Sequence, residues 1–93
     1  MARLVARIRI LPADPESNLD YVVESVKKSM PQGMEMKAYV MEPIAFGLKA
    51  ILGDFLLDDA EGQMDKLEES IKIVEGVGEI EVTNISRQSV KVK

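Results

Sequence analysis

The periodicity of the apolar residues constrains the fold of this chain more than any other feature. In four segments apolar and polar residues alternate, which is typical of strands with one covered face. In two others apolar residues recur at helical spacing, from Leu19 to Met30 and from Met64 to Val74. We expect the strands at residues 2–11, 34–41, 47–57 and 79–86. The predicted element order is therefore β-α-β-β-α-β.

This order predicts a ferredoxin-like sandwich of the α+β class. Both βαβ crossovers are expected to be right-handed, which places the two helices on one face of a four-stranded antiparallel sheet. The 93 residues then form a single domain, in which residues 88–93 either continue the last strand or fray. The other face of the sheet, which we call the open face, has no helical cover.

The phase of each strand predicts which side chains lie on the open face. The first strand places its arginines there: Arg3, Arg7 and Arg9. The third strand, its neighbour in this topology, places there Leu52, Asp54 and Leu56, with Ile51, Phe55 and Leu57 in the core. We therefore expect Arg–Asp ion pairs between these strands, of small energetic value because they are exposed.

Two further local predictions follow from the spacing of the residues. Strict alternation in the second strand puts Met34, Met36, Ala38 and Val40 on one face, opposite Glu35, Lys37, Tyr39 and Met41. Asp14 and Ser17 precede the first helix and are the residue types that cap helix N-termini, so either is expected to be its N-cap.

Composition excludes several classes of function. The chain has no cysteine and no histidine, so it lacks thiolate chemistry as well as the commonest general base and metal ligand. We expect no enzyme activity, metal site or cofactor. No apolar run approaches the roughly 20 residues of a membrane span, and no signal-peptide pattern precedes the first strand, so we expect a soluble cytoplasmic protein.

Charge argues against nucleic acid as a partner. The net charge is −4, whereas a nucleic-acid binder normally shows a basic excess. RNA-binding sheets of this topology stack bases on aromatic residues of their central strands, where this chain offers only Phe55, in the core phase. Basic residues nevertheless gather near the chain ends: Arg3, Arg7, Arg9, Arg87, Lys91 and Lys93. They form either a surface for an acidic partner or a solvated face.

The connection between the second and third strands, MEPIAFGLKAIL at residues 41–52, contains the strongest candidate for a binding residue. Pro43 restricts the backbone, and Gly47 lets another backbone approach closely. Phe46 stands between them, outside any periodic apolar run. It either projects as an interface anchor or covers the end of the core. Lys49 either contacts an acidic surface or is solvated.

A family resemblance is carried by PIAFGLK, residues 43–49. This stretch resembles the P-I/V-G-F/Y-G-I-K-K-L element in the guanine-exchange domain of the translation elongation factor 1-beta family. The likeness extends over essentially the whole chain, since LPADPESNLDYVVESVKKSMPQG resembles the first-helix segment of that family, LLDDAEG its acidic turn and EIEVTNISR its closing strand. The short length and the EPIAFGL spelling are most similar to the archaeal form, which consists of this domain alone.

The resemblance implies a guanine-nucleotide exchange factor. Such a factor promotes replacement of GDP by GTP on the GTPase elongation factor 1-alpha, and so regenerates its active form during polypeptide elongation. The implied partner is elongation factor 1-alpha, with no direct contact to nucleic acid or membrane. We expect the factor to be a monomer or weak dimer.

The resemblance also implies which residues contact the GTPase. The aromatic of the family motif inserts into the partner and corresponds to Phe46, flanked by Pro43 and Gly47. A basic residue near the end of the last strand reaches toward the magnesium and switch region, and alignment places Arg87 there.

This chain departs from the family pattern at several positions. It continues past Arg87 with QSVKVK, so Lys91 or Lys93 are alternatives for the basic role. Ala45 replaces the glycine of the motif and Ala50 its second lysine, whereas Lys49 is retained.

A competing interpretation is a small ferredoxin-like protein-binding or regulatory module without exchange activity. Its contacts would lie on the open face around Leu52 and Leu56, and Phe46 would be buried. Solvent accessibility of Phe46 would distinguish the two.

Overall fold

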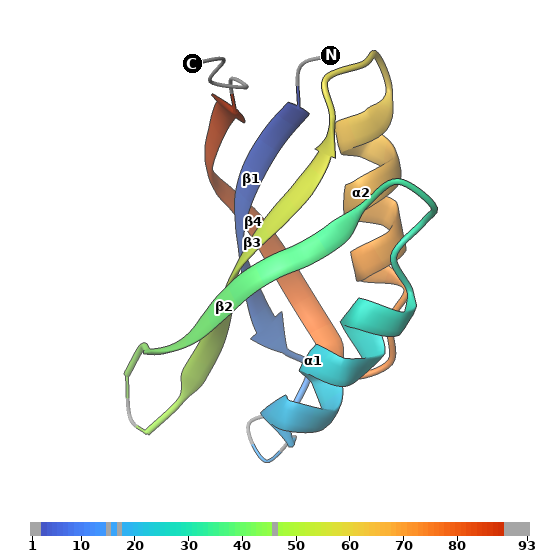
Figure 1. Ribbon diagram of the computed structural model, residues 1–93. Coiled ribbons are helices and arrows are strands. Elements are labelled where there is room, and N and C mark those ends of the chain that lie inside the picture. The colour runs from blue at the N-terminus through green and yellow to red at the C-terminus, as the bar shows by residue number, and fades with distance from the viewer. Residues whose placement is uncertain (1–2, 15, 17, 46, 89–93) are drawn as a thin grey trace.

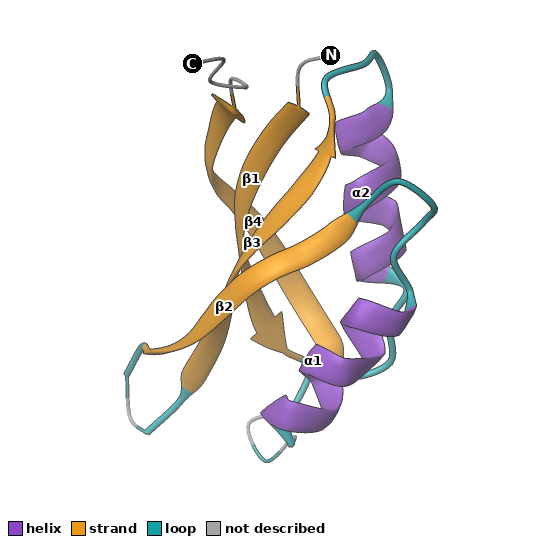
Figure 2. Cartoon of the chain, viewed as in Figure 1, coloured by secondary structure: helices purple, strands orange, loops and turns teal. Residues whose placement is uncertain are grey.

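In the described part of the chain, four strands form one antiparallel sheet and two helices lie against one of its faces, as Figure 1 and Figure 2 show. The computed structural model describes residues 3–14, 16, 18–45 and 47–88. Its elements are β1 (Arg3–Pro12), α1 (Leu19–Lys28), β2 (Glu35–Pro43), β3 (Lys49–Asp58), α2 (Gln63–Lys72) and β4 (Val77–Gln88). The strand order is β2-β3-β1-β4, and each neighbouring pair is antiparallel. The predicted ferredoxin-like fold is confirmed.

The hydrophobic core lies between the helices and the sheet. To the core cluster the central strands contribute Ala6, Ile8, Ile10, Ile51, Phe55 and Leu57, which share one phase on each strand. The helices contribute Val22, Val23, Val26, Leu67 and Ile71. Full burial of one large aliphatic or aromatic side chain stabilises a fold by about 1.5–3 kcal/mol. The predicted phases of β1 and β3 are confirmed for these residues. In the other phase of β3, Leu52, Asp54 and Leu56 are half-buried, while Ala50 at the start of the strand is fully buried.

Asn18 is the N-cap of α1. Its side-chain oxygen accepts hydrogen bonds from two N–H groups of the first turn, at 3.0 and 3.2 Å. The predicted cap at Asp14 is wrong, because this carboxylate instead accepts a hydrogen bond from the N–H of Glu16, at 2.9 Å, and closes a turn upstream of the helix. Ser17 lies outside the described residues.

β2 departs from strict alternation. Its pairing with β3 shifts register between Met36 and Ala38, which leaves Lys37 as an extra residue. Met36 lies opposite a core residue of β3, whereas Ala38 and Val40 lie opposite residues of the open face. The predicted common phase of these three side chains is wrong, because a β-bulge reverses the alternation after it. Met41 packs against the core instead.

β4 is longer than predicted at both ends. It begins at Val77, and the pairing with β1 shifts register between Leu11 and Pro12, which leaves Gly78 as an extra residue. An added Cβ at Gly78 would lie 2.9 Å from the Pro12 carbonyl oxygen. At its other end the strand continues through Arg87 to Gln88. Residues 89–93 of the predicted tail lie outside the described part of the chain.

β4 also contains a bulge. Arg7 pairs with Asn84 and Ile8 pairs with Val82, so Thr83 is an extra residue between them. The Thr83 hydroxyl donates a hydrogen bond to the Arg7 carbonyl, at 3.1 Å. The bulge reverses the phase of every β4 residue that follows it.

Candidate functional site

A tight turn joins β2 to β3 at the position of the predicted anchor. The Ile44 N–H donates to the Leu48 carbonyl at 2.9 Å, and the Leu48 N–H donates to the Ala45 carbonyl at 2.8 Å. Gly47 has a φ of +78°, in the left-handed region that favours glycine. Because this turn occupies the first residues assigned to the third strand, β3 begins later than predicted. Phe46 lies outside the described residues, and its exposure stays a prediction.

An apolar cavity lies beside this turn. Its volume is about 210 Å³, and it is lined by Leu11, Pro12, Ile44, Leu48 and Lys49. Ile44 is 48% exposed and Leu48 is 37% exposed, which is high for aliphatic side chains. Of the predicted contact residues, Lys49 lines the cavity, and Pro43 is exposed at the end of β2. An apolar recess bordered by a lysine suits an apolar side chain with an acidic neighbour.

The arginines of β1 are paired with carboxylates across the open face. Arg7 contacts Asp54 through Nε at 2.9 Å and Nη2 at 3.3 Å, which confirms the predicted Arg–Asp pair. Arg9 contacts Glu42 of β2 and Glu81 of β4, each at 2.8 Å. Donation to Asp54 raises the pKa of Arg7, and donation to Glu42 raises the pKa of Arg9. The Arg9 contacts were not predicted, because they depend on the register of three strands.

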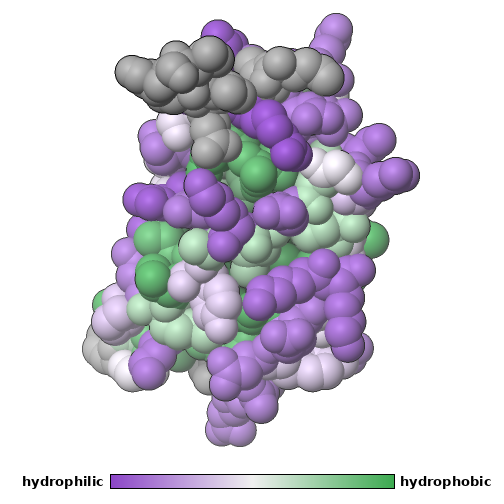
Figure 3. Space-filling view, in the orientation of Figure 1, coloured by the Kyte–Doolittle hydropathy of each residue, from purple (hydrophilic) through white to green (hydrophobic). Residues whose placement is uncertain are grey.

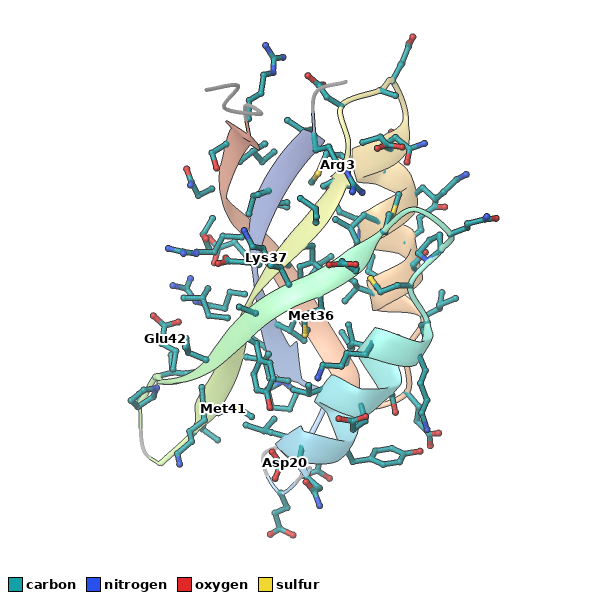
Figure 4. All side chains as sticks on the ribbon, viewed as in Figure 1. Arg3, Asp20, Met36, Lys37, Met41 and Glu42 are labelled. Carbon is teal, nitrogen blue, oxygen red and sulfur yellow. The ribbon has the colours of Figure 1, made fainter. Side chains whose placement is uncertain are left out.

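Arg3 forms a further link at the other end of the sheet, far from Glu42 in Figure 4. Its Nε lies 3.3 Å from Asp58, and its Nη2 donates to the Gly33 carbonyl at 2.7 Å. Each β1 arginine thus has a carboxylate within salt-bridge distance. The predicted basic surface is therefore largely neutralised where the structure describes it, which disfavours phosphate binding there.

A second cavity lies on the open face. Its volume is about 160 Å³, and it is lined by Arg7, Ala38, Tyr39, Val40, Leu52 and Asp54. Leu52 and Leu56 are half-buried, while Val40 is exposed. On the side of the molecule in Figure 3, hydrophobic groups are interrupted by hydrophilic ones and do not form one continuous patch.

Arg87 lies on the helix side of the sheet, away from the other described arginines. It pairs with Leu4, whose side chain packs against the core. The bulge at Thr83 causes this placement, because strict alternation from Val82 would have put Arg87 on the open face. The Arg87 Nη2 lies 2.8 Å from Oδ2 of Asp59, in the turn after β3.

The β2–β3 turn and the end of β4, to which Arg87 belongs, lie at opposite ends of the sheet, as Figure 1 shows. Leu4 of β1 pairs with Arg87 on one side and with Leu57 of β3 on the other, so Arg87 and Leu57 lie at the same level of the sheet. Along β3, Leu57 is eight residues from Lys49. At about 3.3 Å per residue, this distance is about 26 Å. Of the predicted contact residues that the structure describes, Pro43, Gly47 and Lys49 therefore lie on one surface and Arg87 on another.

Comparison with known proteins decides the family. Residues 5–87 match the EF-1 guanine nucleotide exchange domain. The chain belongs to this family. The residues that match the exchange domain include the β2–β3 turn and end at Arg87, whereas Lys91 and Lys93 lie beyond the match and outside the described residues.

Proteins named elongation factor 1-beta from several archaea are similar to this chain over nearly its whole length. That of Staphylothermus marinus is 40% identical over 88 residues, which is 94% of this chain and 98% of its own. That of Hyperthermus butylicus is 43% identical over 90 residues, 96% of this chain and 98% of its own. That of Methanothermobacter thermautotrophicus is 38% identical over 87 residues, 94% and 98% respectively. The predicted relation to archaeal elongation factor 1-beta is confirmed.

Neither described helix of this exchange domain is long and apolar enough to cross a lipid bilayer. Each of the two has ten residues.

Proposed function

We propose that this chain promotes the exchange of GDP for GTP on elongation factor 1-alpha. The match of residues 5–87 to the EF-1 guanine nucleotide exchange domain carries the proposal. The factor acts in the cytoplasm by binding the GTPase, as a monomer or weak dimer, without direct contact to nucleic acid. It makes and breaks no covalent bond, so it is not an enzyme in that sense.

The proposed mechanism is a coupling of two binding equilibria. The factor binds a conformation of the GTPase that holds nucleotide and magnesium weakly. Because the two equilibria are coupled, the exchange factor lowers the affinity of the GTPase for nucleotide. Nucleotide lowers the affinity of the GTPase for the exchange factor by the same ratio. GDP leaves, and abundant GTP then displaces the factor.

The placement of the two candidate surfaces supports this mechanism. The turn around Phe46, with Pro43, Gly47 and Lys49, provides an anchor at one end of the sheet. Arg87 provides a cation at the other end, with a side chain that is 67% exposed. The paired central strands between them form a stiff spacer. When a GTPase contacts both ends of the sheet, the strands fix the distance between the turn around Phe46 and the Arg87 guanidinium.

Stopped-flow release of fluorescent GDP from elongation factor 1-alpha tests the anchor. We expect Phe46→Ala to keep the fold by circular dichroism but to slow factor-dependent release by at least about 30-fold, equivalent to the loss of about 2 kcal/mol that defines an interface hot spot. Tyr21→Ala is a matched control, since Tyr21 is an aromatic residue 59% exposed on α1, and it should not change the rate. An unchanged rate of GDP release with Phe46→Ala would contradict the assignment of this residue as the anchor.

The basic group is tested by comparing Arg87→Ala with a truncation after Gln88. Slower release in Arg87→Ala alone assigns the role to Arg87, and slower release in the truncated chain alone assigns it to Lys91 or Lys93. Equal activity of both variants and the wild type would remove the basic contact from the mechanism.

The alternative function is a protein-binding or regulatory module without exchange activity. The observation that favours it is the cavity on the open face beside Val40 and Leu52. This alternative predicts no acceleration of GDP release by the wild-type chain, and partner binding that is lost on Leu52→Glu but not on Phe46→Ala.

A further inference from the structure

An ion pair joins the end of β4 to the turn between β3 and α2. Oδ2 of Asp59 lies 2.8 Å from Nη2 of Arg87, and the Asp59 side chain is only 28% exposed. The backbone of this turn is held by two hydrogen bonds, from the Ala60 N–H to the Asp58 carbonyl at 3.0 Å and from the Gln63 N–H to the Ala60 carbonyl at 3.2 Å. The carboxylate therefore projects from an ordered backbone toward a long side chain near a strand end.

The contact orients the guanidinium without occupying it fully. An arginine presents five N–H donors in a planar fork, and the contact with Asp59 engages the Nη2 group. The Arg87 side chain remains 67% exposed, so further donors can meet a partner. Arg7 differs, because both its Nε and its Nη2 contact the same carboxylate, that of Asp54.

The two consecutive acids of this turn serve opposite sides of the sheet. Asp58 contacts Arg3, which lies on the open face, whereas Asp59 contacts Arg87, which the β4 bulge has turned to the helix side. Without the bulge, Asp59 and Arg87 would lie on different faces. The ion pair is therefore a consequence of the fold that neither segment shows by itself.

We propose that Asp59 is a positioning residue for Arg87 in nucleotide exchange. This inference rests on the proposed function and on the assignment of the basic role to Arg87. Asp59 holds the guanidinium on the helix side of the sheet end before the GTPase arrives, so less side-chain freedom is lost when the complex forms. Removing the carboxylate leaves the charge of Arg87 in place but removes its orientation.

The experiment measures the second-order rate constant of factor-dependent GDP release for Asp59→Asn, Arg87→Ala and the double variant. We expect Asp59→Asn to lower this constant by about two- to fivefold, the upper range for an exposed ion pair. In the Arg87→Ala background the same substitution should cause no further loss, because Asp59 acts through Arg87. Asp59→Glu should restore part of the loss.

Asp58→Asn is the matched control. It removes the same charge from the adjacent residue of the same turn, but on the side of Arg3. We expect it to leave the rate constant unchanged, which separates orientation of Arg87 from the general effect of one negative charge.

Several results overturn the inference. They are a rate constant that is unchanged or raised in Asp59→Asn, an equal loss in Asp58→Asn, and an additive loss in the double variant. If the wild type accelerates GDP release and Asp59→Asn accelerates it equally, this inference alone is overturned. Failure of the wild type to accelerate release overturns the proposed function, and this inference with it.

Discussion

Gly53 lies on the core side of β3, at a point where the sheet has room for no side chain. A Cβ added there would lie 3.0 Å from Cε1 and 3.3 Å from Cζ of Phe55, and 3.3 Å from Cε of Met36, whereas ordinary contacts begin at 3.4 Å. The Phe55 ring is completely buried, so it has little space into which to move. We predict that Gly53→Ala destabilises the fold through this contact.

The magnitude follows from two opposing effects. Overpacking of a well-packed core costs about 1–3 kcal/mol. Replacing glycine by alanine reduces the freedom of the unfolded chain and stabilises by about 0.4–1 kcal/mol. The free energy of unfolding should therefore fall by about 1–2 kcal/mol. For a domain of this size, each kcal/mol lowers Tm by about 4–8 °C.

Urea and thermal unfolding, followed by circular dichroism, measure this loss. Phe55→Leu provides the matched background, because it removes the ring atoms closest to the added Cβ. In that background Gly53→Ala should be neutral or stabilising, which gives a coupling energy of about 1–3 kcal/mol between the two positions. The reasoning is refuted if Gly53→Ala is as stable as the wild type, or if its cost is the same in both backgrounds.

Two further substitutions test local structure. Asn18→Ala removes the side-chain cap of α1 and should lower the free energy of unfolding in urea by about 0.5–2 kcal/mol, and Asn18→Asp should retain most of it; an unaffected Asn18→Ala variant would contradict the role of the cap. Gly47→Ala places a Cβ in open space but at a φ of +78°, so only backbone strain opposes it, and we expect a loss of about 1–2 kcal/mol. Gly47→Asn should lose less, since asparagine tolerates this region, and equal losses would argue against strain as the cause.

The core phase of the central strands was predictable because successive side chains of each strand lie alternately toward the helices and toward the open face. In β1 and β3 the alternation runs without interruption, so the core phase and the pair between Arg7 and Asp54 followed from the sequence. Arg9 was different, because its contacts with Glu42 and Glu81 depend on how β2 and β4 align with β1. Register of that kind is set by long-range packing.

The edge strands were predicted less well, although one signal was present in β4. Strict alternation from Val82 would place Asn84 and Ser86 toward the core and Ile85 toward the open face, which is the less favourable choice for all three. An extra residue at Thr83 resolves this conflict. The same reasoning would have placed Arg87 on the helix side.

The candidate site was predictable in part. Phe46 was identified from its place outside the periodic pattern and from the family motif, and it lies outside the described residues. The cavity of Leu11, Ile44 and Leu48 beside the turn could not be predicted, because it joins the end of β1 to a connection far away in the sequence. Asp59 was identified only as part of a segment that resembles the acidic turn of the family, since its contact with Arg87 depends on the β4 bulge.

The bulges of the outer strands have a consequence for how copies of this protein behave in a crowded solution. β2 and β4 are the outer strands of the described sheet, and the edge of a regular sheet is a template on which a strand from another chain can add. Here β2 is interrupted at Lys37 and β4 at Gly78 and Thr83, so their outward-facing peptide groups do not form one long even row. The irregularity that turns Arg87 to the helix side also makes the sheet a poor seed for fibrils.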